Sequence, residues 1–330
     1  MKVSTEVKGN QRMATDELKV GTLFVKPGSR ASAMQELVTN GHRICIPIFA
    51  INGKEPGVTL AVTGGVHGAE YASIAAALQI GRTLQPDKLR GRVIIAPVAN
   101  MPAFQARSVY ICPLDGKNLN RVFPGQADGS TSEQLAHWLF ENVIRQANYY
   151  VDLHGGDLIE ALVPFTIYYR SGNPKVDEAS LEIAKVFGIR YVVRSESKGS
   201  AFSAASEVGI PAILTEAGAQ GIWKPEDVNL HITGLNRLMW HLKMIDGPAP
   251  EPLPTKVLEQ FVWLRSEHDG FYYPKVSVGD SVQKDQGLGS VTDFEGNVLQ
   301  SLVASADGRV LFLVSSLAIN QGDPLLSIGA

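Results

Sequence analysis

Residues 58–70 read VTLAVTGGVHGAE, and residues 71–84 read YASIAAALQIGRTL. The first stretch is a largely apolar run that leads into two glycines, which predicts a buried strand followed by a tight loop. The second is rich in alanine and leucine with helical periodicity, so we expect a helix directly after the loop. This order of elements is typical of an α/β sheet.

The same alternation of strands and helices continues along the chain. Further strands are predicted at residues 91–100, 149–156, 165–170, 191–194 and 212–218, and helices at residues 132–147 and 178–187. Ser132 is expected to cap the first of these two helices. Alternation of this kind predicts an α/β fold with a largely parallel or mixed sheet that is covered by helices on both faces.

A change in composition divides the chain. Residues 247–254 read GPAPEPLP, in which four prolines make a stiff, extended spacer. Beyond it helical periodicity disappears, and short strand-like runs alternate with turns of the Gly-Asp type. We therefore predict a catalytic α/β domain at residues 1–246 and a small all-β module at residues 255–330.

Composition and charge exclude several classes of function. The 330 residues include 30 basic and 33 acidic side chains, and no block of like charges argues for nucleic acid or an anionic membrane as partner. Residues 1–19 lack the apolar core of a signal peptide, and no apolar run is long enough to span a bilayer. Cys45 and Cys112 have no partner at metal-ligand spacing, as expected of free thiols in a reducing compartment. These features predict a cytoplasmic protein.

Three residues at the ends of predicted strands form a candidate metal site. His67 and Glu70 follow the first strand and enter the helix, so both side chains lie on one face of its first turn. His154 ends the strand at residues 149–156, and the carboxyl ends of such strands are where ligand sites of open α/β sheets form. Two imidazoles and one carboxylate are a catalytic zinc set that leaves a coordination position open.

Further candidates surround this set. Glu216 ends another strand and is suited to act as general base on a metal-bound water and then as acid to the leaving amine. Arg121 can bind a substrate carboxylate through two parallel hydrogen bonds, with Asn120 as an additional donor. Arg107 lies in a segment that could fold over the metal and present its guanidinium to a developing oxyanion.

Four motifs in series resemble the succinylglutamate desuccinylase/aspartoacylase family, whose members are related to zinc carboxypeptidases. They are TGGVHGAE (63–70), NLNRVFPG (118–125), VDLHGG (151–156) and LTEAGAQG (214–221). The resemblance implies a zinc-carboxypeptidase-like mixed sheet and one Zn²⁺ per chain. It also implies that His67, Glu70 and His154 are the zinc ligands and that Glu216 is the catalytic base. By the same resemblance, Asn120 and Arg121 are the carboxylate-binding pair, and Arg107 is the arginine that polarises the scissile carbonyl.

Two positions depart from the family pattern. Asn118 stands where many members carry an aspartate that supports a zinc-bound histidine, and its carboxamide oxygen can still accept a hydrogen bond without supplying charge. Residues 203–214, SAASEVGIPAIL, lack the arginine that aspartoacylase presents to the aspartyl side chain, which argues against N-acetylaspartate as substrate. In its NLNR-FPG motif, the sequence resembles more closely the branch of the family that deacetylates N-acetyl-diaminobutyrate.

The all-β module resembles the barrel hybrid of biotinyl and lipoyl carriers. Such carriers expose a modified lysine at a hairpin tip, whereas the corresponding hairpin here, residues 303–310, reads VASADGRV without lysine. A carrier function is therefore not expected. We expect instead that the module packs beside the catalytic domain and shapes the mouth of the site through His268, Tyr272 or Tyr273.

The sequence thus predicts a zinc-dependent amidohydrolase that cleaves the linear amide of a small N-acyl amino acid or N-acyl amine. Two alternatives stay open: a carboxypeptidase-like zinc peptidase, and a non-catalytic binding or carrier protein. The sequence does not define the acyl group, the amine, the natural metal or the role of the module. It is compatible with a homo-oligomer without giving the number of copies.

Overall fold

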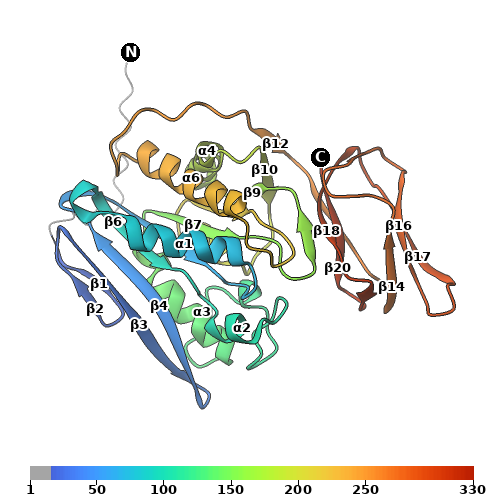
Figure 1. Ribbon diagram of the computed structural model, residues 1–330, viewed down its shortest axis with the longest axis horizontal. Helices are drawn as coiled ribbons and strands as arrows, with labels where there is room; N and C mark the ends of the chain where they lie inside the picture. Colours follow the sequence, from blue (N-terminus) through green and yellow to red (C-terminus); the bar gives the residue numbers. More distant parts are fainter. Residues whose placement is uncertain (1–15) are drawn as a thin grey trace.

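The computed structural model describes residues 16–330 and is built around one large mixed sheet (Figure 1). The nine strands of this sheet run in the order β12-β10-β9-β11-β7-β5-β6-β4-β3. In that order their bounds are Lys256–Leu258, Tyr191–Ser195, Phe165–Tyr169, Ala212–Glu216, Tyr149–His154, Glu55–Gly64, Arg90–Ala96, His42–Asn52 and Ser29–Thr39. Strands β5, β7 and β11 are parallel neighbours, so their carboxyl ends lie at one edge of the sheet.

Helices cover both faces of the sheet and bury two separate apolar cores. Side chains of α1, α4 and α6 contribute to one core, and side chains of α3 and α5 contribute to the other, against which α2 also packs. The helices are Tyr71–Thr83 (α1), Met101–Ala106 (α2), Thr131–Asn142 (α3), Pro174–Phe187 (α4), Ala201–Glu207 (α5) and Pro225–His241 (α6). Short 3-10 turns are Pro86–Lys88 (η1), Leu119–Arg121 (η2) and Ile144–Gln146 (η3). The predicted α/β class, with helices on both faces, is confirmed.

Two local features differ from the expectation. Helix α3 begins at Thr131 and is capped by Ser130, which forms a reciprocal capping box with Glu133, so the assignment of Ser132 as cap was wrong. The helix also ends at Asn142, before η3. At the amino-terminal side, a small antiparallel pair, Leu18–Val20 (β1) and Leu23–Val25 (β2), and the long antiparallel hairpin β3–β4 precede the predicted strands.

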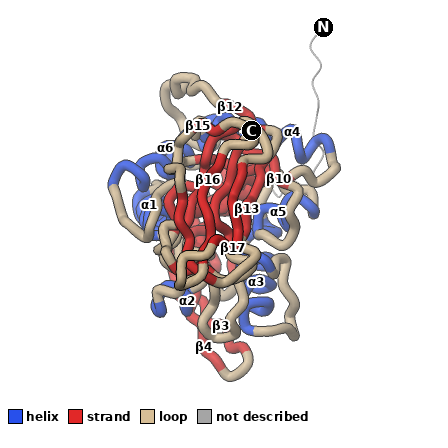
Figure 2. The backbone as a smooth tube through the Cα atoms, turned by 90° about the vertical axis from the view of Figure 1, so that its right-hand side faces the viewer, coloured by secondary structure: helices blue, strands red, loops and turns tan. Residues whose placement is uncertain are grey.

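The carboxyl-terminal module is all-β, as predicted. One of its sheets has the strand order β13-β20-β18-β15, and the other has the order β17-β16-β14-β19. The strands are Phe261–Arg265 (β13), Gly270–Pro274 (β14), Ser281–Val282 (β15), Gly287–Thr292 (β16), Val298–Val303 (β17), Gly308–Val314 (β18), Ala318–Ile319 (β19) and Pro324–Gly329 (β20). Figure 2 views the molecule from the side of this module, with β13, β16 and β17 in front.

Strand pairing ties the module to the catalytic sheet. Residues 247–255 carry no helix or strand, and the chain then adds β12 to the edge of the nine-stranded sheet, parallel to β10, before it enters the module. In return, Glu160–Leu162 (β8) of the catalytic part pairs with β18 of the module. The module is therefore held beside the carboxyl-terminal continuation of β7. Among residues 16–330, no helix has the length and apolar character needed to cross a membrane.

Candidate metal centre and active site

The loop between β5 and α1 places the first two predicted ligands. Glu70 is the residue directly before α1, and its Oε1 lies 2.7 Å from Nδ1 of His67. Between them, Gly68 packs against the backbone of α2, where an added Cβ would lie 2.2 Å from the carbonyl carbon of Ala103. Only glycine allows this close approach, so the loop is held where His67 and Glu70 face each other.

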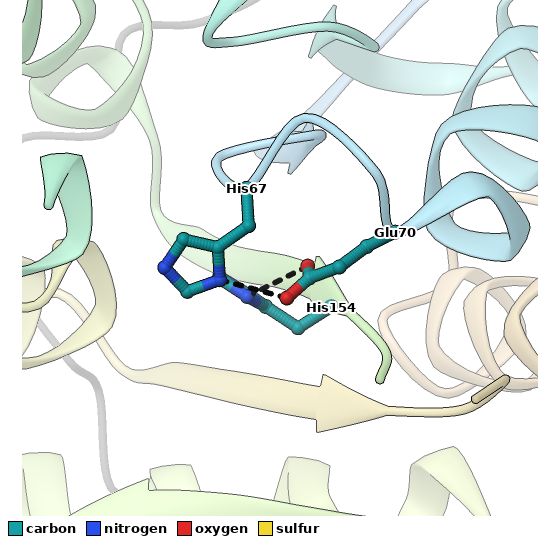
Figure 3. A group of neighbouring side chains, drawn as sticks. All are labelled: His67, Glu70 and His154. Carbon is teal, nitrogen blue, oxygen red and sulfur yellow. Dashed lines mark hydrogen bonds and ion pairs between the residues drawn. The ribbon is translucent and has the colours of Figure 1, made fainter. Parts of the chain in front are cut away.

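The third predicted ligand arrives from the neighbouring strand. His154 is the last residue of β7, and its Nδ1 lies 3.0 Å from Oε2 of Glu70. Figure 3 shows both imidazoles facing the Glu70 carboxylate, and their ring centroids are 5.0 Å apart. One ligand atom from each of the three residues lies within 4.8 Å of the others. The structure thus brings together the three residues that the sequence separates.

The outer nitrogen of each imidazole lies next to a side-chain oxygen. Nε2 of His154 lies 3.1 Å from Oδ2 of Asp152, and Nε2 of His67 lies 3.1 Å from Oδ1 of Asn118. That amide oxygen also accepts from the backbone N–H of Asn120, which fixes the orientation of the amide. With the proton on Nε2, next to these oxygens, each imidazole would have its Nδ1 lone pair free for a cation on the side of Glu70. This donor set fits a divalent cation of the zinc type.

The charge of Glu70 agrees with such a site. Burial by itself would raise the pKa of this carboxyl group, but the adjacent His154 and His67 lower it to about 2. Glu70 is therefore an ionised carboxylate between two imidazoles. Burying a carboxylate is costly without a positive partner, and a bound cation would provide one.

The metal candidate lies in a cavity of about 600 Å³. Glu216, the last residue of β11, pairs in register with His154 and lines this cavity. Its Oε2 is buried and has no hydrogen-bond partner among the described residues, and burial raises the pKa of the group well above its ordinary value. A carboxyl group in this setting holds a proton more readily than a solvated one, as proton transfer in catalysis requires.

The turn η2 delivers the predicted substrate-binding pair to the same cavity. Nδ2 of Asn120 lies 3.5 Å from Nε2 of His154, and its Oδ1 accepts from the backbone N–H of Ala201. Arg121 lines the cavity and donates to the carbonyl of Asn120. Partial desolvation lowers the pKa of Arg121, and the positive charge of Arg265 lowers it further. Two guanidinium groups close enough to affect each other form a site for an anionic group.

Arg107 is placed differently from the other predicted residues. It follows α2 in a left-handed conformation with φ of 54°, is exposed, and is not among the described residues that line the cavity. From the same loop, Tyr110 does line the cavity, with its ring 6.3 Å from that of His67. The oxyanion role of Arg107 stays a prediction.

Several residues of the site were not identified from sequence. Asp152 could have been, because it stands two positions before His154 on a strand and so shares its face. The module also contributes to the cavity wall, but not through His268, Tyr272 or Tyr273, so that expectation was wrong. Its contributions are Phe261, Trp263, Arg265, Phe312 and Pro324. One more cavity residue, Glu160, carried no sequence signal at all.

Comparison with known proteins agrees with these features. The chain is 29% identical over 294 residues to an N-alpha-acetyl-L-2,4-diaminobutyric acid deacetylase of Halomonas elongata, covering 86% of this chain and 85% of that relative. Its fold matches a succinylglutamate desuccinylase/aspartoacylase from Rhodobacter sphaeroides with a TM-score of 0.80 at 28% identity, covering 91% of this chain and 94% of the other. It also matches the product-bound ectoine utilization protein EutE (DoeB) from Ruegeria pomeroyi, with a TM-score of 0.83 at 25% identity, covering 98% and 100%.

The family model for the succinylglutamate desuccinylase/aspartoacylase catalytic domain matches residues 56–242, more than half of the chain. This segment contains β5 from its second residue onward, β7, β11 and all three residues of the metal candidate. The resemblance seen in the four sequence motifs is confirmed, and the chain belongs to the succinylglutamate desuccinylase/aspartoacylase family.

Proposed function

We propose that this protein is a zinc-dependent deacylase that hydrolyses the amide bond of a small N-acyl amino acid. The observation that carries the proposal is the convergence of His67, Glu70 and His154 on one wall of a cavity that also holds Glu216 and Arg121. Metal ligands, a proton-transfer group and a carboxylate-binding group are the parts that such a hydrolysis needs. The named relatives, a deacetylase and a desuccinylase, support this class of reaction.

His67, Glu70 and His154 would hold one Zn²⁺ through two Nδ1 atoms and a carboxylate oxygen. When bound, the cation would lower the pKa of a coordinated water and act as a Lewis acid on the carbonyl oxygen of the substrate. Three protein ligands leave room for these partners. Asp152 and Asn118 keep the imidazoles in the tautomer that presents Nδ1.

Glu216 is the proton carrier of the proposed reaction. Its carboxylate accepts a proton from the attacking water and then delivers it to the leaving nitrogen. Arg121, with Asn120 beside it, holds the substrate carboxylate so that the scissile carbonyl lies near Glu216.

Two other readings compete with this one. A carboxypeptidase-like peptidase would cleave peptides, whereas a deacylase would cleave N-acyl amino acids and leave peptides intact. A binding or carrier protein would turn over neither. The absence of a nucleic-acid or membrane partner, and location in the cytoplasm, stay predictions.

The proposal is tested with purified protein against acetyl-, succinyl- and formyl-amino acids and against dipeptides, with release of the free amine as readout. We expect turnover of at least one N-acyl amino acid and none of the dipeptides. If peptides alone are cleaved, the peptidase reading is correct. If no substrate of either class is turned over by zinc-loaded protein, the proposed hydrolase function is wrong.

The Glu216→Gln variant tests the role of the base. Glutamine keeps the shape of the side chain but cannot accept the proton, so we expect kcat to fall by roughly 10²- to 10⁴-fold. The zinc content should stay that of the wild type, because Glu216 is not one of the three ligands. A variant that retains zinc and a near-normal kcat would exclude this role.

A further inference from the structure

His231 is a buried histidine that the proposed mechanism does not use. It lies in α6, is completely buried, and is not among the described residues that line the cavity. Apolar side chains of the same helix, such as Leu235 and Leu238, fill the core around it. A polar imidazole is costly in such a core unless its nitrogens have hydrogen-bond partners, so these partners indicate its role.

Both ring nitrogens of His231 bond to the chain at the carboxyl end of β11. Nε2 lies 3.3 Å from the backbone carbonyl oxygen of Ala217, and it must donate this bond because a carbonyl only accepts. Nδ1 lies 3.2 Å from the hydroxyl group of Thr215. Burial lowers the pKa of His231 to about 4, so the ring is neutral near neutral pH and Nδ1 accepts from this hydroxyl. One imidazole therefore binds the residues on both sides of Glu216.

The peptide that follows Glu216 lies beyond the regular sheet. Glu216 is the last residue of β11, and two residues later Gly218 has a φ of 90°, a left-handed conformation that ends the extended backbone. Ala217, between them, donates its N–H to the carbonyl of His154 at 3.2 Å and accepts from His231 at its own carbonyl. The direction in which the Glu216 side chain leaves the sheet therefore depends on a peptide that His231 holds.

His231 and the cavity lie on opposite faces of β11. Successive side chains of a strand point to opposite faces of a sheet. Leu214 and Glu216, two positions apart, both line the cavity, whereas Thr215 between them meets His231 of α6. The imidazole thus reaches the site only through the backbone of β11, and it is not placed to exchange a proton with a substrate.

We propose, on the basis of the deacylase function above, that His231 is a positioning residue that holds the backbone on both sides of Glu216 and keeps its carboxylate beside the metal ligands. Without the imidazole, the carbonyl of Ala217 and the hydroxyl of Thr215 lose a buried partner, and the end of β11 can shift. Proton transfer needs donor and acceptor within hydrogen-bond reach, and a misplacement of about 1 Å can lower a rate by roughly 100-fold.

The first test replaces the imidazole by a ring without hydrogen-bonding nitrogens. We expect His231→Phe to lower kcat for an N-acyl amino acid by roughly 10- to 100-fold. KM should change little, because Asn120 and Arg121 come from η2, and the zinc content should stay that of the wild type. His231→Gln, whose amide nitrogen can donate to the carbonyl of Ala217, should restore part of kcat. An unchanged kcat in His231→Phe would overturn the proposal.

The decisive test repeats the substitution in the Glu216→Gln background. If His231 acts through Glu216, the double variant should have the kcat of Glu216→Gln within about 2-fold, because the group that is positioned is already gone. A histidine with a merely structural role would instead lower kcat by the same factor in both backgrounds, and that result would refute the positioning role.

The matched control is Leu235→Ala. Leu235 is buried one turn after His231 on the same face of α6, and its truncation loosens the packing of the helix while the bonds to β11 remain. At a temperature where both variants are folded, we expect Leu235→Ala to retain the kcat of the wild type. A loss as large as that of His231→Phe would mean that loosening α6 is sufficient, against the proposal.

Thr215→Val takes the place of His231→Phe in the same cycle if the latter does not fold. It removes the hydroxyl that bonds to Nδ1 and keeps the branched shape of the side chain. We expect a several-fold loss of kcat that disappears in the Glu216→Gln background. No loss, or an equal loss in both backgrounds, would contradict the inference.

The outcomes separate this inference from the proposed function. If Glu216→Gln lowers kcat as expected while His231→Phe does not, His231 has no positioning role and the deacylase function stands. A near-normal kcat in Glu216→Gln would remove the proposed role of the base itself. Failure of the zinc-loaded wild type on every N-acyl amino acid would remove the deacylase function.

Discussion

The carboxylate behind His154 contributes to the metal site without being a ligand. Oδ2 of Asp152 lies 3.1 Å from Nε2 of His154, and its Oδ1 accepts from the hydroxyl of Thr63 at 2.6 Å. The side chain is completely buried, so it can adopt no alternative solvent-exposed position. A carboxylate in this position makes the imidazole a stronger ligand and fixes its orientation.

We expect Asp152→Asn to weaken zinc binding by about 10- to 100-fold, because the amide cannot supply the negative charge that supports His154. Zinc affinity measured by competition with a chelator checks this. The matched control is Asp115→Asn, which removes a carboxylate that binds Ser132 and touches no metal ligand. Equal affinity in Asp152→Asn and the wild type would show that this carboxylate does not act on the metal site.

Among single residues, the sequence predicted those whose positions follow from their place in a loop or at the end of a strand. His67 and Glu70 share a loop, and His154 stands at a strand end, so their meeting followed from the order of elements. Asn118 was expected to accept a hydrogen bond from a ligand histidine, and its Oδ1 does lie 3.1 Å from Nε2 of His67. Glu160 could not be predicted, because its place in the cavity depends on a turn whose partner strand belongs to the module.

At the scale of elements, the β5–α1 loop depends on its packing against α2. The backbone of Gly68 approaches that of Ala103 and Phe104 so closely that an added Cβ would lie 2.2 Å from an atom of each. Both contacts are with backbone, which cannot rotate away as a side chain could. Any larger residue must move the loop or the helix.

We therefore expect Gly68→Ala to separate His67 from Glu70, with loss of zinc and of activity, and to lower the free energy of unfolding by about 1–3 kcal/mol. Metal analysis and thermal unfolding check both effects. Gly287→Ala is the control, because an added Cβ there meets nothing within 4 Å. Full zinc content in Gly68→Ala would show that the loop tolerates the displacement.

Elements with a strong apolar signal in the sequence were predicted more accurately than elements with a weak one. The strands that became β5, β7 and β11 are continuous apolar runs, as expected of strands buried on both faces. The hairpin β3–β4 was not predicted. Strand β3 alternates buried or half-buried with exposed residues and includes several polar side chains, so its apolar signal is weak. The cap of α3 was displaced by two residues because Ser130 and Ser132 both fit the local pattern, and only the bond to Glu133 distinguishes them.

At the scale of the whole molecule, the module completes the cavity. Five residues from its strands β13, β18 and β20 line the cavity, and Arg265 lies close enough to Arg121 to lower its pKa. The contacts depend on β8 pairing with β18 and on β12 joining β10. The sequence indicated the all-β character of the module but not this docking, because pairing between strands far apart in the chain leaves no local signal.

We expect Arg265→Ala to raise KM for an N-acyl amino acid by roughly 2- to 5-fold with little change in kcat, because a charge at the rim of a site contributes up to about 1 kcal/mol. Steady-state kinetics on the wild type and the variant check this. Arg309→Ala is the control: this arginine also belongs to the module but bonds to Gly279 and Ser281. Equal KM values in wild type and Arg265→Ala would show that the module contributes shape and not charge.

The central claim is that the three ligands hold one catalytic cation, and metal analysis of the purified protein tests it most directly. Elemental analysis of the wild type and of His154→Ala, both refolded or purified with zinc and dialysed identically, gives the stoichiometry per chain. The account predicts about one zinc in the wild type and far less in the variant, as for a site that loses one of three protein ligands. A wild type without stoichiometric metal, or a variant that retains it in full, would contradict the account.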